Sequence, residues 1–170
     1  MCRKALIGAH VAGSLKIAAV TVAAIAAFAA NTGANAASPF ERLAGSWTGG
    51  GRVTFEGGQT ERLRCNARYA SSGGGNRLDL TIRCASPATS FELRGDLAYQ
   101  GGRVSGSWQE RTLGASGRAG GRANAGSIVM RISGSASGSM SVALSGGAQT
   151  VTVTTIDTAL RGINVSLRRR

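Results

Sequence analysis

Apolar and polar residues alternate most regularly between Thr60 and Ala85. In the first part of this stretch, TERLRCNARYA, every second side chain is apolar or small, as in a half-buried strand. The second part, RLDLTIRCA, repeats the alternation. The segment SSGGGN between them is rich in glycine and typical of a turn. The pattern therefore predicts a β-hairpin with one apolar face.

This hairpin would bring two cysteines together. If it turns between Gly74 and Gly75, Cys65 and Cys84 lie directly opposite each other on the apolar face. An even pair of cysteines is expected in a protein exported to an oxidising compartment. We therefore predict a disulfide, worth about 3 kcal/mol by the loop-closure estimate. Two buried free thiols are the alternative.

Similar alternation continues along the rest of the chain. The stretch from 113 to 126 has the Gly/Ala/Ser composition of a flexible linker, but a meander needs a returning strand there, and we assign one to 116–123. Short turns between the strands favour antiparallel neighbours. Outside the hairpin, the predicted strands are 47–55, 90–99, 103–112, 116–123, 127–133, 138–145, 149–156 and 161–168.

The predicted fold is all-β, an antiparallel up-and-down meander of about 8 to 10 strands. An open meander exposes two edges, so we expect a closed or nearly closed barrel; a flattened barrel or an open half-barrel is the alternative. An outer-membrane barrel would place apolar side chains outward, whereas here the outward positions include Arg62, Arg77 and Arg131. The outer face is therefore expected to meet water.

Residues 1–36 have the pattern of a signal peptide. Arg3, Lys4 and Lys16 carry positive charge, the run 17–30 is apolar, and residues 34–36 read Ala-Asn-Ala. Cleavage there would leave a lead over 37–44, with one helical turn near 40–44, and a single barrel domain over 45–170. No transmembrane span would remain, and the protein would be periplasmic or secreted. A retained N-terminal anchor is the alternative.

Composition beyond Ala36 excludes most catalytic chemistry. This part of the chain has no His, no Lys and two Cys, so the usual general bases and zinc ligand sets are missing. We therefore predict no enzyme activity, no cofactor and no metal. A pair of catalytic carboxylates is the alternative, but the acidic residues fall mostly at strand ends or beside arginines, as surface charges do. They are Glu41, Glu56, Glu61, Asp79, Glu92, Asp96, Glu110 and Asp157.

The start of the first strand resembles a known family. It reads Gly45-Ser46-Trp47, and a Gly-x-Trp at the start of a small exported β-protein is similar to the lipocalins and the wider calycin group. In that family the Trp lies across the closed end of the barrel and packs against an Arg near the chain terminus. The terminal run 168–170 is Arg-Arg-Arg and offers that partner. The alternative is a Trp that simply fills core space.

Five aromatic residues share the inward parity of the strands. Barrel mouths commonly bind apolar ligands, so these residues are predicted to contact a small apolar or amphipathic ligand in the interior. The alternative is that they only fill the core. They are Trp47, Tyr69, Phe91, Tyr99 and Trp108.

Arginine dominates the outward positions. Seventeen arginines and eight acidic residues follow Ala36, which gives a net charge of +9. The planar guanidinium suits bidentate contacts with anions, so these residues are candidates for holding an anionic lipid or polysaccharide of the cell envelope. A solvated surface with no partner is the alternative. The predicted anion-binding residues are Arg62, Arg64, Arg68, Arg83 and Arg168.

Three functions are consistent with these patterns: a barrel binding a small ligand, an envelope protein binding anionic polymers or lipids, and an inhibitor of a secreted protease. The third rests on a resemblance to compact periplasmic metalloprotease inhibitors, which are small disulfide-bearing barrels that begin with a Trp. In that family an N-terminal segment enters the protease, a role that only residues 37–44 could take. Nucleic acid is not expected, because no exposed strand alternates aromatic and basic residues.

Overall fold

The structure, a computed structural model, describes residues 38–156 and 158–170, and the predicted signal peptide over 1–36 lies outside them. No helix in the described part is long and apolar enough to cross a membrane. The elements are α1 (Pro39–Leu43), β1 (Gly45–Phe55), η1 (Glu56–Gly58), β2 (Thr60–Ser72), β3 (Arg77–Ala85), β4 (Ser90–Gln100), β5 (Arg103–Glu110), β6 (Ala115–Asn124), β7 (Ser127–Gly134), β8 (Ser137–Ser145), β9 (Ala148–Ile156) and β10 (Leu160–Arg169).

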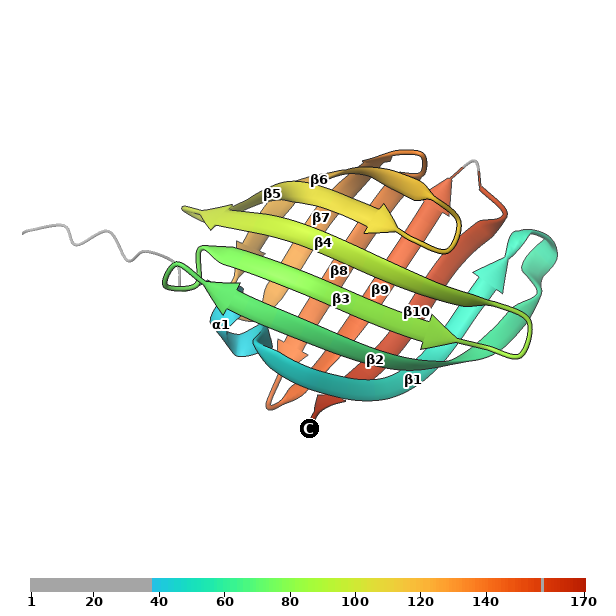
Figure 1. The fold of residues 1–170 in the computed structure, drawn as a ribbon, viewed down its shortest axis with the longest axis horizontal. Coiled ribbons are helices and arrows are strands. Elements are labelled where there is room, and N and C mark those ends of the chain that lie inside the picture. Colours follow the sequence, from blue (N-terminus) through green and yellow to red (C-terminus); the bar gives the residue numbers. More distant parts are fainter. Residues whose placement is uncertain (1–37, 157) are drawn as a thin grey trace, which may run out of the picture. The chain divides into compact units, whose positions relative to one another are not determined.

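The strands form a closed antiparallel barrel in which each strand pairs with the next along the chain and β1 pairs with β10. In Figure 1, β1–β4 run across the front of the barrel and β7–β10 lie behind them. The predicted all-β meander is therefore confirmed, and the closed barrel rather than the open half-barrel is correct. The Gly/Ala/Ser stretch does form a strand, β6, because its small inward residues still complete both neighbouring ladders.

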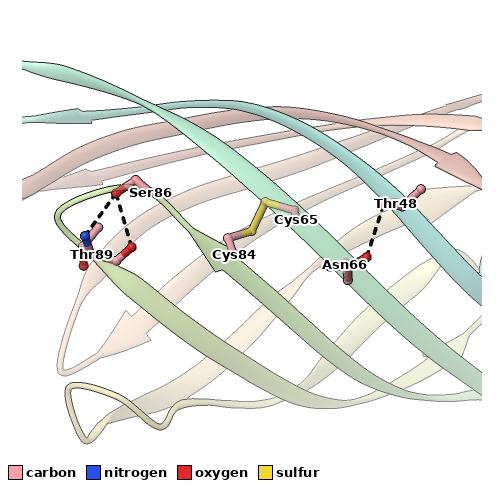
Figure 2. The surroundings of a disulfide bond; sticks show 6 residues. All are labelled: Thr48, Cys65, Asn66, Cys84, Ser86 and Thr89. Atoms are coloured by element: carbon pink, nitrogen blue, oxygen red, sulfur yellow. Dashed lines mark hydrogen bonds between the residues drawn. A yellow bond between two sulfur atoms is a disulfide. The ribbon is translucent and has the colours of Figure 1, made fainter.

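The predicted hairpin is formed by β2 and β3. Their register places Cys65 directly opposite Cys84, and the two residues form the predicted disulfide (Figure 2). Both cysteines are buried. At the end of β3 the chain turns through Ser86, whose hydroxyl accepts a hydrogen bond from the backbone N of Thr89 at 3.1 Å.

Helix α1 covers one end of the barrel. Its first turn is fixed by Ser38, whose side chain accepts a hydrogen bond from the backbone N of Phe40, and by Pro39 at the first helical position. The Ser38 hydroxyl also donates to the carbonyl of Gly75 in the β2–β3 turn. Phe40 is 0% exposed and Leu43 is 2% exposed, so the helix seals this end.

Glycines allow neighbouring strands to approach closely inside the barrel. A Cβ at Gly51 would lie 1.9 Å from the carbonyl oxygen of Asn164, so no other residue fits there without moving the backbone. The β3–β4 register runs through Gly95 without a break, and the Leu80 side chain lies 3.1 Å from the position that a Cβ on Gly95 would occupy. The β1–β10 register shifts between Thr54 and Phe55.

Candidate functional site: the open end of the barrel

The end covered by α1, which we call the closed end, is held together by Trp47. This side chain is 2% exposed, and its Nε1 donates to the carbonyl of Leu43 at 2.7 Å. The guanidinium carbon of Arg169 lies 4.7 Å from the Trp47 ring centroid. Arg169 also donates to the carbonyls of Arg42 and Ala44. The tryptophan–arginine packing implied by the calycin resemblance is therefore present.

Two further aromatics of the predicted ligand set are packed into the closed end. The Tyr99 ring meets Phe40 edge-on at a centroid distance of 6.0 Å, and the Tyr69 ring meets Trp47 at 6.4 Å. The Tyr69 hydroxyl donates to Oε1 of the buried Gln149 at 3.2 Å. Burial raises the pKa of Tyr69 far more than this hydrogen bond lowers it, so the phenol stays protonated. These aromatics belong to the core rather than to an accessible site.

At the opposite end, residues 56–58, 86–89, 111–114 and 135–136 turn the chain. No α-helix of the described residues lies over this end, and we call it the open end. Many inward-facing apolar side chains here are only partly buried, although Val53 and Cys84 are buried. Two of them, Phe91 and Trp108, belong to the predicted ligand set. The partly buried residues of the open end are Phe55, Phe91, Leu93, Trp108, Ile132, Met140, Val153, Leu160 and Ile163.

Trp108 carries a polar group without a partner. Its Nε1 is buried and has no hydrogen-bond partner among the described residues. Gly117 lies directly opposite on β6, and a Cβ there would come within 2.9 Å of Trp108 Nε1. A buried N–H without an acceptor is costly in a folded protein, and an acceptor on a bound molecule would remove that cost.

Glu110 faces inward at the open end but is engaged with the backbone. Its carboxylate accepts hydrogen bonds from the backbone N of Glu92 at 2.9 Å, of Thr112 at 3.0 Å and of Leu113 at 2.6 Å. Partial burial raises the pKa of Glu110, but the three amide donors together outweigh it and lower the pKa. Glu110 is therefore an ionised cap of the β5–β6 turn and a poor general acid.

Other carboxylates of the described residues serve as charge partners. Glu92 contacts Arg83 Nε at 2.8 Å and Arg94 Nε at 2.7 Å, and these hydrogen bonds lower its pKa. Glu56 pairs with Arg161. No cluster of three His, Cys, Asp or Glu side chains that could hold a metal ion occurs within 38–156 and 158–170.

The five predicted anion-binding arginines do not form one cluster. Arg62, Arg64 and Arg68 project outward along β2 and are exposed. Arg83 on β3 is already paired with Glu92. Arg168 is on β10, opposite Thr48 of β1.

Comparisons with known proteins support the fold but no sequence family. No family model and no curated protein matches the chain. Rv2717c from M. tuberculosis is similar in structure, with a TM-score of 0.59 and 14% identity over 78% of this chain and 97% of that one. The S-type phycobiliprotein lyase CPES from Guillardia theta has a TM-score of 0.52 and 12% identity over 77% of this chain and 90% of that one. The fold is lipocalin-like.

Sequence reasoning treated the five interior aromatics as one group, whereas the structure divides them between the two ends. It also missed Ile132, Met140 and other aliphatic residues of the open end, because parity shows only that a side chain points inward. One signal was present: these residues lie in the half of each strand far from Trp47, and the resemblance had already placed Trp47 at the closed end.

Proposed function

We propose that the protein is an exported, non-enzymatic barrel that binds a small apolar or amphipathic molecule in its open end. The observation that carries the proposal is the contrast in burial between the two ends. Trp47, Phe40 and Leu43 are sealed at the closed end, whereas Phe91, Trp108 and their neighbours remain partly accessible. Apolar side chains that line an opening, with few polar groups among them, are the usual lining of small-molecule sites.

The Trp108 N–H adds a preference within this class of ligand. A molecule with an apolar body and one hydrogen-bond acceptor would bury the half-exposed side chains and also pair Nε1. We therefore favour an amphipathic ligand over a pure hydrocarbon.

The proposal of a binding protein rather than an enzyme rests on the chemistry of the chain. One structural neighbour is by name a lyase, so the fold alone does not decide between binding and catalysis. The described residues lack Lys and His, and Glu110, two positions from Trp108 on β5, accepts hydrogen bonds from backbone amides. Export is supported by the Cys65–Cys84 disulfide.

The protease-inhibitor hypothesis loses support, because the segment it requires is part of the barrel. Phe40 and Leu43 are buried, and Trp47 and Arg169 both bind carbonyls of this segment. A segment held in this way is not free to enter a protease.

Calorimetric titration with 1-dodecanol, a neutral molecule with an apolar tail and one hydroxyl, tests the proposal. Ile132→Gln places a polar side chain inside the open end and should weaken binding about tenfold, in line with the cost of burying an amide among apolar groups. Ser133→Gln is the matched control, because it places the same side chain at the next position of β7, which faces outward. It should leave affinity unchanged.

Circular dichroism and denaturation midpoints would establish that both variants are folded. The proposal is wrong if the folded wild-type protein binds neither dodecanol nor any other single-chain amphiphile tested. It is also wrong if Ile132→Gln and Ser133→Gln weaken binding equally, because the ligand would then lie outside the barrel.

A further inference from the structure

Charge is distributed unevenly around the barrel. Within the described ranges, no Asp or Glu lies on β1 or on β6–β10, whereas arginines occur on β1, β6, β7 and β10. The acidic side chains of the described ranges belong to α1, η1 and β2–β5. One side of the barrel is therefore basic without compensating carboxylates on its own strands.

The strand register arranges part of this side into a row that runs across the strands. At its two ends, arginines face each other directly: Arg62 opposite Arg52 on β2–β1, and Arg103 opposite Arg122 on β5–β6. Between the ends, across β10, β9, β8 and β7, the row has only uncharged side chains, namely Asn164, Thr152, Ser141 and Val129.

The opposed arginine pairs place like charges side by side, as Asp79 and Asp96 do on β3 and β4. Like charges directly opposite each other in an antiparallel ladder are destabilising. None of these four arginines makes an ion pair with a carboxylate of the described residues, although Arg83, Arg94 and Arg161 do. Two such pairs lie at the ends of one row. An anionic ligand bound there would offset the repulsion between the paired arginines.

The outer wall is hollowed along this row. A concave region of about 630 Å³ lies over β1, β2, β9 and β10 and is lined by Arg52, Asn164 and Thr54 among others. A second, of about 980 Å³, lies over β6–β9 and is lined by Arg122, Arg131 and Ser139 among others. Both regions include Thr154, so they adjoin at β9, and we call the two together the outer trough.

The outer trough is long enough to hold a segment of an extended polymer. Arg52 and Arg122 are five strand spacings apart, which is ~24 Å along the wall. Its floor consists mainly of hydroxyl groups and glycines, with Val129 and Ile156 as exposed apolar side chains. Arginine guanidinium groups bind carboxylates and sulfates in bidentate fashion, and hydroxyl and amide side chains hydrogen-bond neutral hydroxyl groups.

We propose that the outer trough binds a linear acidic polysaccharide, with its anionic groups held by arginines at the two ends and its neutral hydroxyls in the middle. A polymer can lie within a hollow, whereas a planar lipid surface cannot follow one, and the residues that line the trough include no aromatic side chain of the kind that anchors a membrane-binding face. The arginines of this surface point outward, whereas the ligand proposed for the open end lies inside the barrel, so the two kinds of binding can be tested separately.

Size-defined heparin oligosaccharides are a suitable probe, with binding measured by calorimetry at several salt concentrations. Affinity should rise with oligosaccharide length until the chain spans the trough and then level off, and it should fall with salt. Arg52→Ala/Arg122→Ala removes one arginine from each end and should weaken binding of the long oligosaccharide about tenfold or more. It should leave dodecanol binding unchanged.

Arg68→Ala/Arg77→Ala is the matched control, because it removes the same charge from exposed positions of β2 and β3 outside the trough. It should weaken binding less than about threefold. Equal losses in the two double variants would overturn the proposal, since net charge alone would then explain binding. Failure to bind any oligosaccharide at physiological salt would also overturn it, as would trough-dependent binding to phosphatidylglycerol vesicles without binding to oligosaccharides.

Discussion

The closed and open ends of the barrel are built from the same ten alternating strands, yet their interiors differ. At the closed end, five residues of helix bury Phe40 and Leu43 against Trp47, and Arg169 fastens the chain over them. At the open end the described part of the chain provides no such helix, and Phe91 and Trp108 stay partly accessible. The difference shows that strand alternation determines which side chains point into the barrel. A short covering helix then determines which of these side chains are fully buried.

The largest expected effect is a loss of stability, and it should differ between two phenylalanines, one at each end of the barrel. Phe40→Ala should lower the free energy of unfolding by about 3–5 kcal/mol, because it leaves a cavity under the helix where the side chain is 0% exposed. Phe91→Ala removes a partly exposed ring and should cost only about 1 kcal/mol. Urea denaturation at neutral pH measures both. Equal losses would mean that the two ends are equally packed.

Loss of the disulfide should come next. Cys84 lies one residue from the end of β3 at the open end, so the bond to Cys65 ties β2 and β3 together in that half of the barrel. Cys65→Ala/Cys84→Ala should lower the free energy of unfolding by about 3 kcal/mol, because 19 positions separate the bonded residues. A non-reducing peptide map must show the bond in the wild type. Unchanged denaturation of the double variant would contradict the prediction.

A smaller effect is expected at the C-terminus, where two adjacent arginines have different surroundings. Arg169→Ala loses the contact with Trp47 and both carbonyl acceptors, and it should destabilise the protein by about 1–2 kcal/mol. Arg168→Ala is the control, since this exposed side chain faces outward. Thermal denaturation followed by tryptophan emission would compare them. If Arg168→Ala were the more damaging change, the account of the closed end would be wrong.

The smallest effect depends on pH. The folded-state pKa of Glu110 is lowered below its unfolded value of about 4.3, so the carboxylate stabilises the fold above that pH and the contribution is lost as pH falls through the folded pKa. Glu110→Gln should therefore be less stable than the wild type at pH 7, by ~0.5 kcal/mol because water still screens this partly buried group. The difference should vanish in strong acid. A difference that persists unchanged at low pH would point to packing rather than charge.

The register of the hairpin was predictable because two local signals agreed: alternation placed Cys65 and Cys84 on one face, and the glycine turn placed them opposite each other. Strand β6 was predictable from topology although its composition resembles a linker. The division of the interior was not predictable. The Ser38-Pro39 start is typical of a helical turn, but it does not show that this turn covers one end of the barrel. The outer trough was also hidden, since Arg52 and Arg122 become related only when the register of every intervening strand is known.

The most direct test of the open-end site uses the indole N–H signals of Trp47 and Trp108, the only two tryptophans in the chain, in a nitrogen-15 NMR titration with 1-dodecanol. Trp47→Phe assigns the two signals. The Trp108 N–H has no protein acceptor in the described structure, so its proton should shift downfield as it binds the ligand hydroxyl, while the Trp47 N–H, already bound to Leu43, should not move. A titration that moves the Trp47 signal and leaves the Trp108 signal in place would contradict the account.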